Sequence, residues 1–136
     1  MRDKPIIDKD ALFRILNQTQ YEYSLKIRNL VETRPEFHVR YADEDTEEWR
    51  QKTHDLVGLF LNGELISIED LRENPSKFFK LCQYACWIDG SVGATLFAGY
   101  LIFGGSLAYL GTDRHKYIFH DVDTYKLPGC FAMTEV

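Results

Sequence analysis

The sequence is poor in cysteine and in basic residues, and each shortage argues against a class of protein. Three cysteines in 136 residues form an odd, sparse set, which argues against a disulfide-stapled secreted fold and favours a reducing compartment. Lys and Arg number 16 against 21 acidic residues, with no basic run, so no nucleic-acid partner is expected. With 45% hydrophobic residues, the chain is too apolar for intrinsic disorder and fits one globular domain.

Self-contained catalytic and metal-binding motifs are missing as well. The sequence has no nucleophile elbow, zincin helix, phosphate-binding loop or dinucleotide fingerprint. The histidines show no metal-ligand spacing with Cys82 and Cys86, so no metal site is predicted. Both cysteines and Cys130 are expected to be small core residues. His115 and His120 are expected at the surface, because a lone histidine needs an unusual environment to be functional.

Hydrophobic periodicity predicts helices along most of the chain. Apolar residues at helical spacing predict helices over about 11–32 and 75–86. Asp10 is the expected N-cap of the first helix. A further helix between these two should begin at Asp45 and Glu48, which have the spacing of a capping box.

The segment from Gly90 to Thr112 allows two interpretations. It contains 23 residues and no charge, which is long enough for a transmembrane helix. It could equally be the central helix of a soluble domain, covered on all sides by other helices. We favour the soluble helix, without stable membrane insertion, because the rest of the chain supplies amphipathic helices that need a surface to pack on.

This central helix is expected over about Asp89–Leu110, with Gly111 as its C-cap. One seam should face the core, formed by Val92, Leu96, Tyr100, Phe103, Leu107 and Leu110. The glycines inside the helix each cost about 1 kcal/mol relative to alanine. Close helix contact, or room for a ligand, should offset that cost.

The end of the chain alternates like a strand, from Cys130 to Glu135. The sequence therefore predicts an all-α fold. The expected architecture is a helical bundle with a central buried apolar helix, plus one short strand-like C-terminal tail.

Several segments of the sequence resemble acyl-CoA oxidases, within the acyl-CoA dehydrogenase/oxidase superfamily. The string Gly129-Cys130-Phe131-Ala132-Met133-Thr134-Glu135 is similar to the segment that opens the β-domain of these enzymes. Leu110-Gly111-Thr112-Asp113-Arg114-His115-Lys116-Tyr117 resembles the turn after their long central helix, and Asp89-Gly90-Ser91 resembles the start of that helix. Arg34-Pro35-Glu36-Phe37 resembles an early element of the oxidase branch. The resemblance covers about residues 10–136.

The resemblance implies an FAD-dependent oxidoreductase of fatty-acid β-oxidation. Such a flavoprotein performs the α,β-dehydrogenation of fatty acyl-CoA, and molecular oxygen then reoxidises the flavin and yields hydrogen peroxide. Phe131 and Met133 would pack near the isoalloxazine, and Thr134 would hydrogen-bond its edge. The substrate-binding residues beside the central helix would be Thr95, Ala98, Gly99 and Ile102. The resemblance further implies a homodimer in the peroxisome, or in the cytoplasm of a bacterium.

The same resemblance implies that this chain holds only part of such an enzyme. The glutamate base, most of the FAD site and the CoA site lie in later parts of the family, so no catalytic residue is expected here. Residues 1–126 would be the N-terminal helical domain, and 127–136 the first strand of a truncated flavin-binding β-domain. The chain would be a fragment or truncated form that is inactive alone. Two alternatives are a non-catalytic short isoform or interaction module, and a small single-span membrane protein through 90–112.

Overall fold

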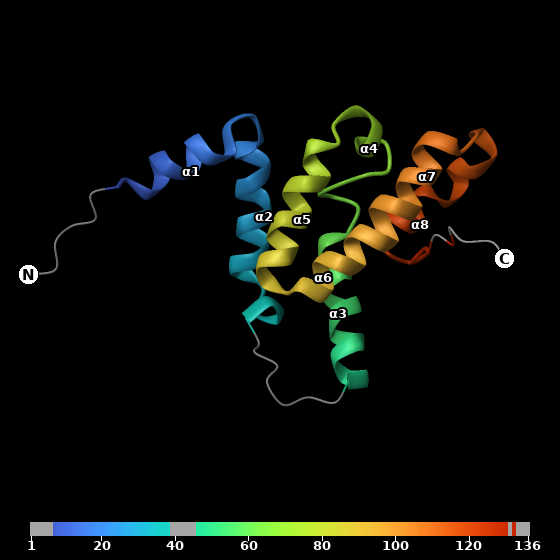
Figure 1. Cartoon of the computed structure of the whole chain (residues 1–136), viewed down its shortest axis with the longest axis horizontal. Helices are drawn as coiled ribbons and strands as arrows, with labels where there is room; N and C mark the ends of the chain where they lie inside the picture. Colours follow the sequence, from blue (N-terminus) through green and yellow to red (C-terminus); the bar gives the residue numbers. More distant parts are fainter. Residues whose placement is uncertain (1–6, 39–45, 131, 133–136) are drawn as a thin grey trace, which may run out of the picture.

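A computed structural model describes residues 7–38, 46–130 and 132, and most of them are helical (Figure 1). The α-helices are α1 (Lys9–Asn17), α2 (Tyr21–Thr33), α3 (Thr46–Phe60), α4 (Asp70–Glu73), α5 (Ser76–Ile88), α6 (Gly90–Thr95), α7 (Phe103–Leu110) and α8 (Phe119–Asp123). Short 3₁₀ turns cover Gln18–Gln20, Pro35–His38 and Asp113–Ile118, and a π-helical turn covers Leu96–Ile102. No strand occurs among the described residues, which confirms the all-α prediction.

The N-terminal helical region is broken, whereas the sequence predicted one helix over 11–32. Helix α1 is capped by Asp8 rather than Asp10, because the Asp8 carboxylate accepts the backbone N–H groups of Asp10 and Ala11. At its end the Asn17 amide donates to the carbonyl of Phe13, 2.7 Å away, and Gln18 takes a φ of 40°. A short polar side chain that bonds nearby backbone groups competes with helix continuation. Helix α1 buries no residue and projects away from the body (Figure 1).

The core lies where α2, α3 and α5 meet one face of the helix that follows. Ile27, Val57, Phe60, Phe78, Leu81, Leu96 and Tyr100 are among its fully buried side chains. The ring of Phe78 stacks on that of Tyr100, with the centroids 6.3 Å apart. Apolar residues at helical spacing in three separate helices therefore converge on one cluster.

Helices α6 and α7 and the π turn between them form one continuous helix, Gly90–Leu110, called here the long helix. Asp89 caps it by accepting the backbone N–H groups of Ser91 and Val92, where the sequence predicted its start. Gly111 is its C-cap with a φ of −67° and a ψ of 155°, and a Cβ there would overlap the carbonyl oxygen of Leu107. Glycine is thus required at this helix end by a close backbone approach.

The core-facing seam of the long helix departs from the predicted one in its second half. Val92, Leu96 and Tyr100 are buried as expected, but the seam continues through Gly104 and Ala108. The predicted end of the seam, Leu110, is 76% exposed. A π-helix has more residues per turn than an α-helix. Residues four apart therefore stay on the core-facing side of the long helix.

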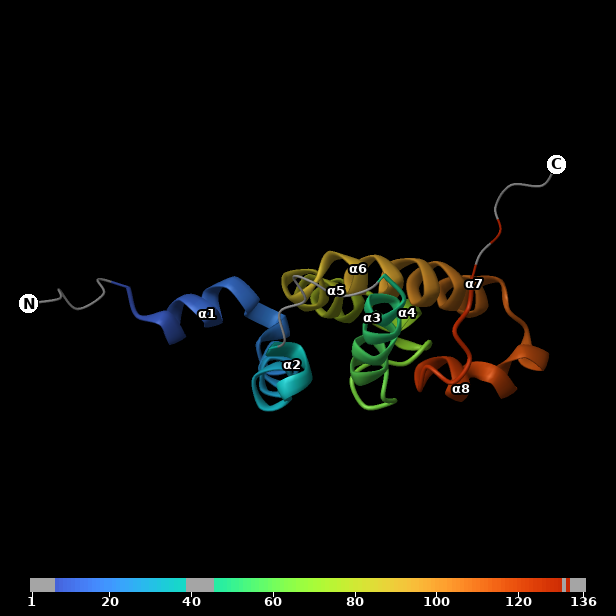
Figure 2. The same cartoon turned by 90° about the horizontal axis from the view of Figure 1, so that it is seen from below.

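The long helix is covered on one side, and the expectation that other helices surround it is wrong. Only 33% of its most apolar 18-residue window is buried. Figure 2 shows α2, α3 and α8 on one side of the long helix and no helix of the described residues on the opposite side. This opposite side, called the outward face, includes the exposed residues Ala94, Phe97 and Ala98. Within the described part of the chain, the long helix alone is long and apolar enough to cross a membrane.

The cysteines are not core residues, contrary to the sequence prediction. Cys82 is half-buried, and Cys86 and Cys130 are exposed. Cys86 stands at the close contact between α5 and α6, where its Sγ occupies the space that a Cβ on Gly93 would need. The missing side chain of Gly93 therefore allows close helix contact, one of the two reasons expected for these glycines.

Candidate functional site at the tail crossing

A buried carboxylate fixes the end of α8 to the long helix. Oδ1 of Asp123 accepts the hydroxyl of Tyr100 at 2.7 Å and the backbone N–H of Ile68 at 2.9 Å. Asp123 is 8% exposed and Tyr100 is 1% exposed. Burial raises the pKa of Asp123, while the two hydrogen bonds oppose that rise. Burial and the neighbouring carboxylate also raise the pKa of Tyr100, which therefore stays protonated and donates.

The residues after α8 set the direction of the C-terminal tail. Tyr125 has a φ of 56°, and its ring stacks on His54 of α3 with the centroids 5.9 Å apart. The Tyr125 hydroxyl also hydrogen-bonds Nδ1 of His54. The backbone N–H of Leu127 then donates to the carbonyl of Asp121, 3.0 Å away. The left-handed residue and these contacts turn the chain back toward the long helix.

The tail then passes the long helix at two glycines. A Cβ on Gly129 would overlap the ring of Phe103, and a Cβ on Gly99 would lie 3.4 Å from the carbonyl oxygen of Gly129. Figure 2 shows the tail leaving α8 and passing α7 on its way to the opposite side of the long helix. The tail backbone therefore rests directly on the helix, between Gly99 and Phe103, a place called here the tail crossing.

Of the residues predicted to bind the acyl chain, Gly99 lies at this crossing, where the carbonyl of Gly129 occupies the space beside it. Ala98 is exposed, and Thr95, Gly99 and Ile102 are half-buried. Their role in acyl binding stays a prediction.

The residues predicted to contact the flavin, Phe131, Met133 and Thr134, lie outside the described residues. Their described neighbours Cys130 and Ala132 are exposed and follow directly on the tail crossing. The long helix contains no charged residue, so the surface beside this segment is apolar and uncharged. Such a surface suits a flat aromatic ring or a lipid chain, because neither needs a counter-charge.

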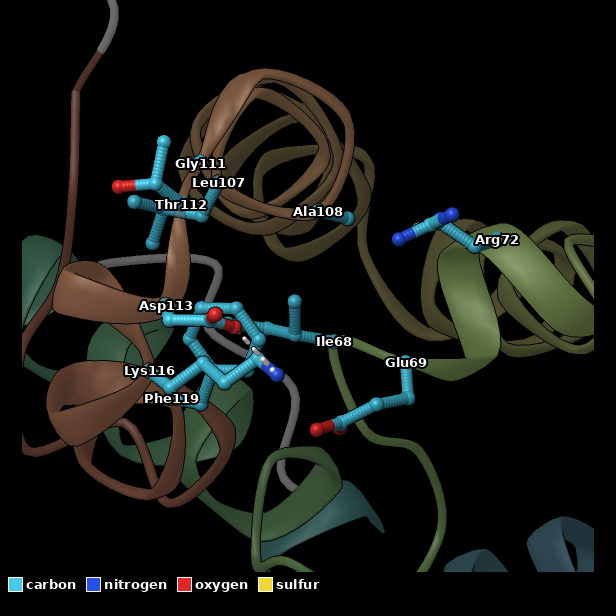
Figure 3. A pocket seen from close by; sticks show the side chains of 10 residues that line it. All are labelled: Ile68, Glu69, Arg72, Leu107, Ala108, Gly111, Thr112, Asp113, Lys116 and Phe119. Carbon is cyan, nitrogen blue, oxygen red and sulfur yellow. Dashed lines mark ion pairs between the residues drawn. The ribbon is translucent and has the colours of Figure 1, made fainter.

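A separate pocket of about 460 Å³ lies between α4, the end of α7 and the turn Asp113–Ile118. Its lining residues are Ile68, Glu69, Arg72, Leu107, Ala108, Gly111, Thr112, Asp113, Lys116 and Phe119 (Figure 3). Nζ of Lys116 pairs with Oδ1 of Asp113 at 2.8 Å. The lining contains two basic residues, Arg72 and Lys116, and two acidic residues, Glu69 and Asp113. Its formal charges therefore cancel, and the pocket favours neither an anionic nor a cationic ligand. No sequence motif indicated it, because its walls are about 40 residues apart in the chain.

The two neighbouring thiols of α5 have little metal-binding character. Sγ of Cys82 lies 4.0 Å from Sγ of Cys86. Burial, and then Cys86 itself, raise the pKa of Cys82 to about 11. The thiol is therefore protonated near neutral pH, while metals bind the thiolate. Across residues 7–38, 46–130 and 132, no group of three or more His, Cys, Asp or Glu residues could hold a metal ion.

The chain is similar in sequence to acyl-CoA oxidases of plants and animals. It is 24% identical to acyl-coenzyme A oxidase 2, peroxisomal, of Arabidopsis thaliana, over 96% of this chain and 19% of that protein. It is 27% identical to peroxisomal acyl-coenzyme A oxidase 3 of Homo sapiens, over 70% of this chain and 14% of that protein. An acyl-coenzyme A oxidase of Caenorhabditis elegans is 27% identical over 78% of this chain and 16% of its own length.

No protein-family model and no solved structure matches the chain. The chain spans less than a fifth of the length of these curated relatives. Their similarity nevertheless extends over most of the chain and confirms the resemblance found in the motifs. The chain is therefore a sequence relative of the acyl-CoA oxidases, and its extent corresponds to a segment of such a protein.

Proposed function

We propose that this chain is the helical part of an FAD-dependent acyl-CoA oxidase that acts in peroxisomal fatty-acid β-oxidation. The observation that carries the proposal is the similarity over 131 residues, 96% of the chain, to a peroxisomal acyl-CoA oxidase. The tail crossing supports it, because Gly129, which begins the string similar to the start of the family's β-domain, lies beside Gly99, one of the predicted acyl-binding residues.

The chain would supply binding surfaces rather than reacting groups. Thr95, Ala98 and Ile102 would form an apolar wall for the fatty acyl chain. Phe131 and Met133 would pack against the isoalloxazine, and Thr134 would donate hydrogen bonds to its edge. Bound FAD would supply the acceptor for the substrate's β-hydride. The base that removes the α-proton belongs to a part of the enzyme outside this chain.

A chimera tests this function. The matching segment of the Arabidopsis relative is replaced by residues 1–136, and hydrogen peroxide release is measured with a fatty acyl-CoA. We expect acyl-CoA-dependent peroxide release, and a clear loss in the T134A variant. A T33A variant at the end of α2 serves as the matched control, because that exposed hydroxyl bonds only backbone carbonyls of its own helix. A well-folded, flavin-loaded chimera without activity would contradict the proposal.

The chain alone is expected to be inactive, because most of the FAD site and the base would lie outside it. Purified chain mixed with FAD should show no retained flavin absorbance after gel filtration, and no peroxide release with acyl-CoA. Retention of one flavin per chain would disprove this expectation. The transcript beyond Val136 separates an enzyme fragment from a non-catalytic short isoform, because only the former continues into a glycine-rich loop and a later glutamate.

The outward face of the long helix also favours a second candidate, a small membrane protein. The helix has 21 residues with a mean hydropathy of 1.4, and its outward face carries exposed Phe97. We propose instead that further parts of the oxidase cover this face. Alkaline carbonate extraction of membranes from expressing cells distinguishes the two candidates. If the helix does not span the membrane, the chain should appear in the soluble fraction after extraction. If the helix spans the membrane, the chain should remain in the membrane pellet.

A further inference from the structure

We propose that Gly129 and Phe103 form a positioning contact that sets where the flavin-side segment leaves the long helix; this inference rests on the proposed function. The ring of Phe103 lies where a side chain on residue 129 would stand. The carbonyl of Gly129 meets the helix at Gly99, whose missing side chain leaves room for it. The ring of Phe103 and the bare backbone of Gly99 therefore both meet the tail at Gly129.

The contact is the last of three that fix the path of the tail. Asp123 holds the end of α8, and Tyr125 holds the turn through His54. Only one residue, Cys130, separates Gly129 from Phe131, the first residue predicted to contact the flavin. A displacement of the chain at Gly129 should therefore also displace Phe131, because a single intervening residue gives the chain little length over which to compensate. Catalytic geometry is sensitive to errors on the order of 1 Å.

The crowded surroundings of Gly129 contrast with those of Gly105, a glycine of the long helix. A Cβ on Gly105 would meet no atom within 4 Å. An alanine there should favour the helix without touching the tail. Gly105 therefore provides a matched control for a Gly→Ala change at position 129.

The test measures the position of the tail in the chain itself, without flavin. A nitroxide is attached to the exposed Cys130 in a C82A/C86A background, and paramagnetic broadening of methyl signals is recorded. The Ile102 methyls, beside the crossing, should broaden strongly. Those of Ile15, in the projecting helix α1, should serve as the unbroadened reference.

The G129A variant should lose most of the broadening at Ile102, because its Cβ would overlap the ring of Phe103. F103A should lose it as well, because the ring against which the tail packs is then absent. G105A should leave the broadening unchanged. G99L provides a further route, since its side chain would occupy the space beside the Gly129 carbonyl. Circular dichroism shows that each variant is folded. Unchanged broadening in folded G129A, F103A and G99L would overturn the positioning contact.

The same substitutions in the active chimera separate positioning from simple stability. G129A and F103A should each lower kcat with little change in the KM for acyl-CoA, and G105A should behave as the parent. A parental kcat in folded G129A or folded F103A would refute the role. An inactive parent chimera would instead refute the proposed function, while the broadening experiment would still report on the contact.

Discussion

Replacing Asp123 with alanine should be one of the most destabilising single changes in this protein. The carboxylate accepts two buried donors, the Tyr100 hydroxyl and the Ile68 N–H. Each donor left without a partner costs about 1–3 kcal/mol, so D123A should lose about 2–6 kcal/mol of unfolding free energy. Y100F removes one hydrogen bond to a charged group and leaves no orphaned donor on Tyr100. It should cost about 1.5–3 kcal/mol.

Urea unfolding followed by far-ultraviolet circular dichroism measures these losses. D123N is the matched control, because its amide oxygen can still accept both donors. It should be much closer to the parent than D123A is. A loss of less than about 1 kcal/mol in D123A, the size of an average substitution, would refute the reasoning.

The pH dependence of the same residue gives an independent check. Burial raises the pKa of Asp123 in the folded chain above its value in the unfolded chain. The folded state therefore binds the proton more tightly, and the contribution of this residue to stability increases as pH falls through the folded pKa. D123N should lack that increase. If the parent and D123N change in parallel with pH in acid, the proposed burial effect is wrong.

Two further predictions concern glycines and thiols. G93A should destabilise the chain, because its Cβ would overlap Sγ of Cys86; G105A, with open space around it, should stabilise it by about 1 kcal/mol in the same urea assay. Equal effects of the two changes would contradict the packing described. Cys82 should be alkylated by iodoacetamide more slowly than exposed Cys86, and its rate should increase up to a pH of about 11, the raised pKa of its thiol. Peptide mass spectrometry distinguishes the two sites, and faster labelling of Cys82 would refute the prediction.

Helix positions were predictable because capping and periodicity act over a few residues. Asp89 caps the long helix at the predicted place, and Gly111 ends it. The break at Gln18 was missed because it depends on the Asn17 amide, which bonds both Phe13 and Ser24. Nothing in the periodicity of α1 and α2 indicates which of two competing sets of hydrogen bonds is formed.

The roles of Thr95, Ala98, Gly99 and Ile102 stay a prediction, and the approach of the tail to Gly99 was not predictable from the sequence. The π turn was not visible in the sequence, because a hydrophobic period does not reveal a local change in the number of residues per turn. The buried seam reaches Ala108, whereas its predicted end, Leu110, is exposed.

By itself, the sequence determined the helical class, the uncharged long helix and the similarity to acyl-CoA oxidases, because local periodicity and residue identity carry that information. Only the tertiary structure decided that the tail returns to this helix at Gly99 and Phe103. That return depends on a buried hydrogen bond between Asp123 and Tyr100, residues 23 positions apart. Contacts of this kind come from packing in three dimensions, which no local pattern specifies.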